Sequence, residues 1–216
     1  MSGPFRSIRI RVDWLERNFI VRARRGPTGP AFSPDALPEA NHLEAVTQAV
    51  LSALFRATTH RSDTAVYVVL EGAPDPPRTL RFGGDNLGSL VGLDERSIAE
   101  AIREALRVSV GIGNEEERTS RHGVVVTRRS FDALIKEACA LDGFYYLHRR
   151  GEDIRDVTPA TPAVFVLSDH LAMPRKSEQY MKRLGATPLS VGPKLLFASQ
   201  CIVLIHNELD RSGLPG

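Results

Sequence analysis

The sequence has few cysteines and no long apolar run. Its 216 residues include two cysteines, Cys139 and Cys201, each within an apolar helical pattern. Two isolated cysteines exclude a disulfide framework and a cysteine-rich zinc site, so we expect buried, reduced thiols. No apolar run reaches the ~18 residues that span a bilayer. The first residues are interrupted by arginines and lack the apolar core of a signal peptide. We therefore expect a protein of the cytoplasm with no membrane partner.

Several motifs of large enzyme classes are also missing. The sequence has no dinucleotide fingerprint, no phosphate-binding Gly-Lys-Ser loop and no Gly-x-Ser-x-Gly nucleophile elbow. His148, His170 and His206 stand alone, without the i, i+4 pairing of a helical zinc site. We expect structural histidines and no metal.

Composition and charge are ordinary for a globular protein. Apolar residues make up 42% and charged residues 25%, and the net charge is only +2. This balance does not predict nucleic-acid binding, because the distribution of charge matters more. The pairs Arg149-Arg150 and Arg175-Lys176 are candidates for phosphate contact, with a solvated surface as the alternative.

Apolar periodicity predicts alternating strands and helices. Strands are expected at residues 8–14, 19–21, 64–70, 79–82, 123–127, 144–147, 163–167 and 187–189. Helices are expected at residues 42–57, after the acidic pair 94–95, at 131–141 and 180–184, and in the apolar segment after 192–193. Residues 115–118 are expected to form a solvated loop. The alternation predicts an α/β fold with a mainly parallel sheet and helices on both faces.

Three consecutive predicted strands near the C-terminus end in polar or glycine-containing loops. These loops begin at Leu147-His148, at Ser168-Asp169, and at residues 189–194 around Gly192-Pro193. Ligands of open α/β sheets bind beyond the carboxyl ends of the strands. We therefore expect the three loops to converge on one pocket, whose apolar strand ends suit an adenine and a thioether better than a triphosphate.

Ordered motifs through nearly the whole chain carry a family resemblance. They comprise residues 18–24, 74–77, 94–99 and 145–153, the pair Asp169-His170, and residues 189–190 and 201–210. In these residues the chain resembles the SPOUT class of methyltransferases, specifically the TrmY type, the tRNA pseudouridine-54 N1-methyltransferases. Residues 192–201 look like the bacterial branch of that family.

The resemblance implies one SPOUT domain over residues 1–216. It would consist of an N-terminal extension (1–17), an N-terminal part (18–140) and a cofactor-binding part (141–216) that threads into a C-terminal trefoil knot, a rare topology. It also implies a homodimer that binds RNA, in the first place tRNA. The C-terminal helix, with Asn207 and Asp210, would supply dimer packing.

The resemblance further implies S-adenosylmethionine as the cofactor, held mainly by backbone groups. The residues carried over by position are Leu147, Ser168, Leu189, Ser190, Val191, Gly192, Pro193, Lys194, Leu195, Leu196 and Cys201. Ser168 replaces the glycine usual before Asp-His. Cys201 is expected to be buried against the adenosine.

The implied reaction is direct displacement of the methyl group by N1 of pseudouridine, without a metal. The protein then has to supply positioning and an acceptor for the N1 proton. The Gly-Arg-Leu-Asp segment of archaeal relatives is replaced here by residues 41–44, so Glu44 would stand for the aspartate. We rank Glu44 and Asp63 as candidate acceptors, with Arg96 near the base or phosphates.

Two alternatives stay open. One keeps the cofactor and changes the target to a ribosomal RNA pseudouridine or a ribose 2'-oxygen. The other is a non-catalytic dimer that binds S-adenosylmethionine or RNA, motivated by the altered segment 41–44.

Overall fold

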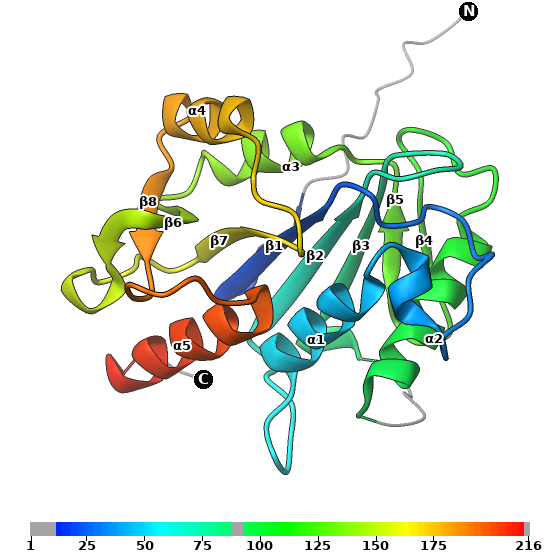
Figure 1. Ribbon diagram of the computed structural model, residues 1–216, viewed down its shortest axis with the longest axis horizontal. Coiled ribbons are helices and arrows are strands. Elements are labelled where there is room, and N and C mark those ends of the chain that lie inside the picture. The colour runs from blue at the N-terminus through cyan, green and yellow to red at the C-terminus, as the bar shows by residue number, and fades with distance from the viewer. Residues whose placement is uncertain (1–11, 88–92, 214–216) are drawn as a thin grey trace, which may run out of the picture.

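A computed structural model describes residues 12–87 and 93–213 of the chain (Figure 1). The strands are β1 (Arg17–Ala23), β2 (Thr64–Leu70), β3 (Arg78–Gly83), β4 (Glu117–Thr119), β5 (Val125–Thr127), β6 (Gly143–Asp153), β7 (Ala163–Ser168) and β8 (Thr187–Ser190). The α-helices are α1 (Leu43–Leu54), α2 (Glu95–Val108), α3 (Phe131–Ala138), α4 (Arg175–Arg183) and α5 (Ala198–Arg211). Short 3-10 turns occupy Leu37–Ala40, Gly84–Asn86 and Ile154–Asp156.

The strands form one eight-stranded sheet in the order β4-β5-β3-β2-β1-β7-β6-β8. The pairs from β2 through β1, β7 and β6 to β8 are parallel, whereas β3, β5 and β4 add an antiparallel edge. The predicted α/β class with a mainly parallel sheet is thus confirmed. The knot is not tested by this topology and stays a prediction.

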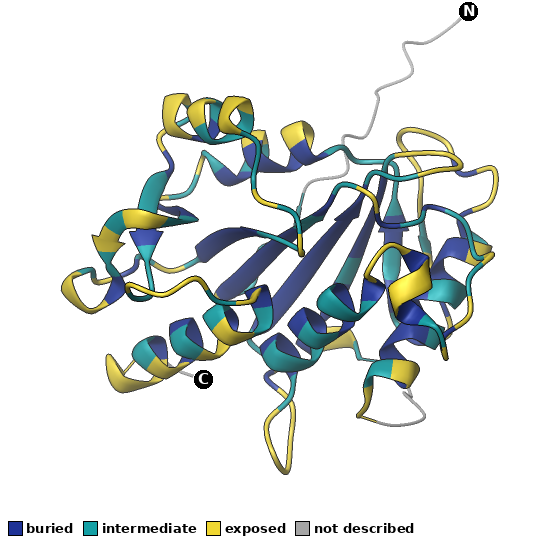
Figure 2. Ribbon diagram, in the orientation of Figure 1, coloured by how far each residue is buried: buried dark blue, intermediate teal, exposed yellow. Residues whose placement is uncertain are grey.

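Helices cover both faces of the sheet, as predicted. Alternate residues along each strand contribute to different cores, because successive side chains point to opposite faces of the sheet. One core joins Phe19, Val66 and Leu80 to α1, α2 and α5. The other joins Ile20 and Tyr67 to α3 and α4. The central strands are buried, and exposure concentrates on the outer helix faces and the loops (Figure 2).

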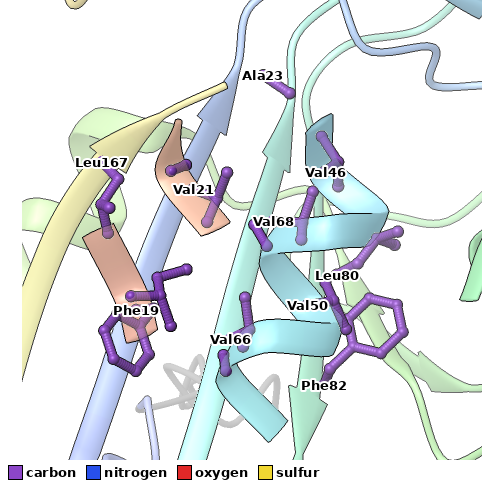
Figure 3. Close-up of a cluster of buried hydrophobic side chains, with 14 of the residues drawn as sticks. Phe19, Val21, Ala23, Val46, Val50, Val66, Val68, Leu80, Phe82 and Leu167 are labelled. Atoms are coloured by element: carbon purple, nitrogen blue, oxygen red, sulfur yellow. The ribbon is translucent and has the colours of Figure 1, made fainter. Parts of the chain in front are cut away.

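The packing between β1, β2 and α1 shows why these segments form as they do. Val66 and Val68 on β2 lie under α1, whose Val46 and Val50 point back at the sheet, whereas Phe19 and Val21 on β1 lie on the side of α5 (Figure 3). Valine and isoleucine favour extended backbone, so the run over residues 64–70 forms a central strand that is buried throughout.

Most predicted elements are found, with four differences. Residues 115–118 were expected to be a loop, but Glu117–Thr119 forms the exposed edge strand β4. Strand β6 continues past residue 147 to Asp153. Helix α4 starts earlier, at Arg175. The predicted strand 8–14 lies largely outside the described residues, and residues 12–14 are not in a strand. Among the described residues, no helix is long and apolar enough to cross a membrane.

A cluster of buried charges joins α5 to the amino-terminal edge of the sheet. Arg17 Nε lies 2.9 Å from Asp63 Oδ2, and Arg17 and Arg61 both donate to the carboxylate of Asp210. These contacts hold the carboxylate ionised, so the pKa of Asp210 is lowered to about 2 even though partial burial opposes ionisation. Asp210 was predicted to serve dimer packing. Its two arginine partners give it a role within the chain, and the dimer packing stays a prediction.

Candidate functional site

The adjacent strands β7, β6 and β8 are parallel, so their carboxyl ends meet at one edge of the sheet. The loops that follow them enclose a cavity of about 620 Å³. Its lining comes from the end of β6, the β7–α4 loop, the face of α4, and the segment between β8 and α5 (Figure 1). A cavity of this size is typical of small-molecule sites.

The residues predicted to hold a cofactor come together here. All of them except Pro193 line the cavity: Leu147, Ser168, Leu189, Ser190, Val191, Gly192, Lys194, Leu195, Leu196 and Cys201. Gly192 has φ 137°, which most side chains avoid, so glycine suits this position in the β8–α5 loop. The convergence of the three loops is therefore found. The identity of the ligand is not tested by it.

An irregularity in β6 shapes one side of the cavity. Both Leu147 and Glu152 lie opposite Leu189 of β8, so residues 148–151 leave the regular ladder between them. A Cβ at Gly151 would lie 2.5 Å from the Leu189 nitrogen and 2.6 Å from the Pro188 carbonyl carbon. Only glycine allows this approach of two backbones. This close approach holds residues 148–151 against β8, and His148 and Arg149 of this segment line the cavity.

The floor and the rim of the cavity differ in polarity. Leu167, Met181 and Leu189 on the floor are buried. Leu195 and Phe197 at the rim are 96% and 67% exposed. The site therefore offers apolar contact below and backbone groups of three loops at its sides.

Cys201 lies on the first turn of α5 and lines the cavity. Burial raises the pKa of its thiol, so it is protonated at neutral pH. Both Cys201 and Cys139 are free, as predicted, but each is half-buried rather than buried. Cys201 packs against the core on one side and lines the cavity on the other, which leaves it half-buried.

Two carboxylate–imidazole pairs meet beside the cavity. In the β7–α4 loop, His170 Nδ1 lies 3.3 Å from Asp169 Oδ2. Before α1, His42 Nδ1 lies 2.8 Å from Glu44 Oε1. The rings of His42 and His170 are in contact, with centroids 4.7 Å apart. Asp169 and His170 line the cavity, whereas His42 and Glu44 stand behind them.

Among the three predicted catalytic residues, the structure brings only Glu44 close to the cavity. Glu44 lies on the first turn of α1, and its Oε2 atom is buried without a hydrogen-bond partner among the described residues. It reaches the cavity only through His42 and His170. His42 and His170 lie between Glu44 and the cavity, and the catalytic role of Glu44 stays a prediction.

Asp63 and Arg96 lie away from the cavity, and their expected roles stay predictions. Asp63 precedes β2 and pairs with Arg17 at the amino-terminal edge, the opposite end of the sheet from the cavity. Arg96 is exposed on the first turn of α2 and pairs with Asp35. Asp63 directly precedes the strand predicted at residues 64–70, and that position already indicates the amino-terminal edge.

Several lining residues were not predicted. They are Tyr146, Val166, His170, Leu171, Ala172, Met173, Glu178, Met181, Phe197, Ala198 and Gln200, whereas His148, Arg149, Leu167 and Asp169 belong to the strand-end segments expected to flank the pocket. Many directly follow or precede the strand ends that were predicted, and this adjacency is the signal that could have found them. No group of three or more His, Cys, Asp or Glu among the described residues is arranged to hold a metal ion.

Comparisons with known proteins agree with this geometry. A family model described as "Putative SAM-dependent RNA methyltransferase" matches residues 16–214. Two curated relatives are each named "Putative pseudouridine methyltransferase". The Vibrio cholerae protein is 38% identical over 195 residues, 90% of this chain and 97% of that protein. The Shewanella frigidimarina protein is 40% identical over 194 residues, 90% of this chain and 98% of that protein.

A solved structure shares the fold. Archaeoglobus fulgidus Nep1, crystallised bound to S-adenosylhomocysteine, matches with a TM-score of 0.59 and 10% sequence identity. The match covers 93% of this chain and 100% of that one. At this identity the likeness is one of fold.

Proposed function

This chain belongs to the family of S-adenosylmethionine-dependent RNA methyltransferases, and we propose that it methylates N1 of a pseudouridine in RNA. The observation that carries the proposal is the single cavity at the carboxyl ends of β6, β7 and β8, lined by nearly every residue expected to hold the cofactor. The names of the relatives support pseudouridine as the target.

The cavity fits S-adenosylmethionine in size and chemistry. Its volume of about 620 Å³ suits a nucleoside that carries an amino-acid side chain. The buried Leu189 and Leu167 would pack against the adenine, and the backbone of residues 189–196 would supply hydrogen bonds. The Nep1 structure with S-adenosylhomocysteine supports a cofactor in this fold.

When bound, S-adenosylmethionine supplies a methyl group already activated on a sulfonium sulfur. The protein then has to hold the target base in line with the carbon–sulfur bond, exclude water and accept one proton. We propose that the loops after β7 and β8 provide the holding surfaces, and that residues 189–196 form the knotted cofactor loop that the family resemblance implies.

Cations at the mouth of the cavity suit an RNA backbone. Arg149 and Lys194 line the cavity, Arg150 follows Arg149, and Arg175 lies two residues after the lining residue Met173. Within the described residues, none of these four side chains has an ion-pair or hydrogen-bond partner. Elsewhere, arginines such as Arg107 on α2 are paired with carboxylates. Unpaired cations beside a site are free to contact phosphates.

Arg150→Ala is expected to weaken RNA binding and to lower its salt dependence. Loss of one phosphate contact reduces the slope of log affinity against log salt by ~0.7–0.9. Affinity measured at several salt concentrations, with Arg107→Ala as the matched control on α2, tests this. Equal slopes for the two variants would contradict the phosphate contact.

We also propose a specific RNA target, a homodimer and a location in the cytoplasm. A T-loop pseudouridine of tRNA is the first target, because the resemblance is to enzymes of that position. Leu195, Phe197 and Val203 are 96%, 67% and 53% exposed, and their burial between two copies would support the dimer. The described strands form a single sheet, which supports one domain.

Nucleoside analysis of RNA from a strain that lacks this protein distinguishes between the possible targets. Mass spectrometry of purified tRNA and ribosomal RNA is expected to show N1-methylpseudouridine missing from the tRNA. Its loss from ribosomal RNA, or loss of a ribose methyl group, would move the activity to another target. Unchanged nucleosides in both RNAs would favour a non-catalytic role.

A further inference from the structure

Two histidines line the cavity, and the groups nearest their Nδ1 atoms favour opposite tautomers. His148 Nδ1 accepts the backbone N–H of Arg150 at 3.2 Å, so a neutral His148 carries its proton on Nε2. His170 Nδ1 lies 3.3 Å from a carboxylate oxygen of Asp169, which can only accept. A neutral His170 therefore carries its proton on Nδ1 and presents a free lone pair on Nε2.

The carboxylate behind His170 is held in place. The side chain of Asp169 is only 1% exposed. Its Oδ1 accepts the Leu171 N–H at 2.9 Å, and its own N–H donates to the carbonyl of Arg22 on β1 at 3.1 Å. Because Asp169 cannot turn freely, its carboxylate stays beside Nδ1 of His170 and favours a proton on that nitrogen.

The ring of His170 is also supported from α1. His42 packs against it at 4.7 Å between ring centroids and 52° between ring planes, and His42 is held in turn by Glu44. Asn41 and His42 have φ of 56° and 60°, a left-handed backbone that residues other than glycine seldom adopt. Two such residues in succession raise the conformational free energy of this segment. In this conformation the His42 ring lies against His170.

We infer that His170 is the group that accepts the N1 proton of the target base, with Asp169 and His42 as positioning residues. The inference rests on the proposed function. The lone pair of N1 forms the new bond to the methyl carbon, and the carbon–sulfur bond breaks with its electrons left on sulfur. The N1 proton passes to His170 Nε2, so base and thioether leave neutral and His170 becomes an imidazolium beside Asp169.

The other acid–base groups near the cavity are less suited to this step. His148 presents a proton, which fits donation to a base carbonyl. Glu44 does not line the cavity, and its Oε1 is engaged by His42. Glu178 lines the cavity from α4 and is the one remaining carboxylate there among the described residues besides Asp169.

The test has two independent readouts. Long-range proton–nitrogen NMR of the wild-type protein, without ligand and with S-adenosylhomocysteine, reports the tautomer of each histidine. His170 is expected to be protonated on Nδ1 and His148 on Nε2. Single-turnover methyl transfer to pseudouridine-containing RNA is expected to slow by 10²–10⁴-fold in His170→Gln. S-adenosylhomocysteine affinity by calorimetry should stay near the wild-type value, and added imidazole should partly restore His170→Ala.

Matched variants decide between the candidates. Glu44→Gln and Glu178→Gln are expected to slow transfer far less than His170→Gln. A larger loss in either, or near-wild-type transfer by His170→Gln, overturns the inference. A proton on Nε2 of His170 also overturns it, whether or not a variant folds. A wild-type protein that transfers no methyl group at all would instead contradict the proposed function.

Discussion

Gly151→Val is expected to lose most of the affinity for S-adenosylhomocysteine. Any Cβ at this position would lie 2.5 Å from the Leu189 nitrogen and 2.6 Å from the carbonyl group of Pro188. Neither neighbour is a flexible side-chain end, so β8 has to move away from β6. The residues that follow β8 line the cavity, and the displacement is carried directly into the site.

The size of the effect follows from overpacking. Forcing side-chain atoms into a filled space costs typically ~1–3 kcal/mol. If most of that cost falls on the ligand-bound arrangement, affinity decreases by roughly 10–100-fold, since each 1.4 kcal/mol is tenfold. Calorimetric titration measures the affinity, and thermal unfolding shows how much of the cost falls on the fold.

Gly113→Ala provides the control. A Cβ at Gly113 would meet only Glu116 atoms, the nearest 3.6 Å away, which is ordinary van der Waals contact. This variant should bind S-adenosylhomocysteine as the wild type does. Unchanged affinity in Gly151→Val would show that β8 and its loop do not form the cofactor site.

The second large effect is loss of stability in acid through His206. The histidine is buried on α5, where its Nε2–H donates to the Ala53 carbonyl at 3.0 Å and its Nδ1 accepts from Arg17 at 3.3 Å. A neutral ring satisfies both bonds. Burial, aided by the charges of Arg61 and Arg17, lowers the pKa of His206 from 6.5 to about 3.

The direction in which stability changes with pH follows from proton binding. Below pH 6.5 the unfolded chain takes up a proton at His206 that the folded chain does not, so acid favours unfolding. The stability is fully present above pH 6.5 and is lost progressively down to about pH 3. The slope is ~1.4 kcal/mol per pH unit, or ~3 kcal/mol between pH 6.5 and 4.5.

Urea unfolding at a series of pH values tests this expectation. His206→Gln, neutral at every pH, should flatten the dependence between pH 6.5 and 4.5. The same substitution at the exposed His60 should leave it unchanged. A wild-type protein with constant stability over this range would contradict a neutral, buried His206.

Much of the fold could be predicted from the sequence, because the signals are local. The run over residues 64–70 is apolar after Thr64 and contains three valines, and β2 occupies those same residues. Asp94 was expected to favour a helix start, and its side chain accepts from the Ser97 N–H at the first turn of α2. Strand β4 has no such signal, since it is three exposed residues stabilised by pairing with β5.

The candidate site could be predicted only where it follows strand ends. Parallel strands bring their carboxyl ends to one edge, so Leu147, Ser168 and the segment after Leu189 were bound to be neighbours. The partnership of His42 with His170 joins segments far apart in the chain, through a strained backbone that the sequence does not reveal. Asp63 was ranked by resemblance, although its position just before the strand at residues 64–70 indicates the amino-terminal edge.

The central claim is tested most directly by one transfer reaction. Purified protein is incubated with isotopically labelled S-adenosylmethionine and an RNA that contains pseudouridine, and the digested nucleosides are separated by mass spectrometry. The structure and the family predict a labelled methyl group on N1 of pseudouridine, and none on the same RNA with uridine at that position. A label on ribose, a label on uridine or no label would contradict the account.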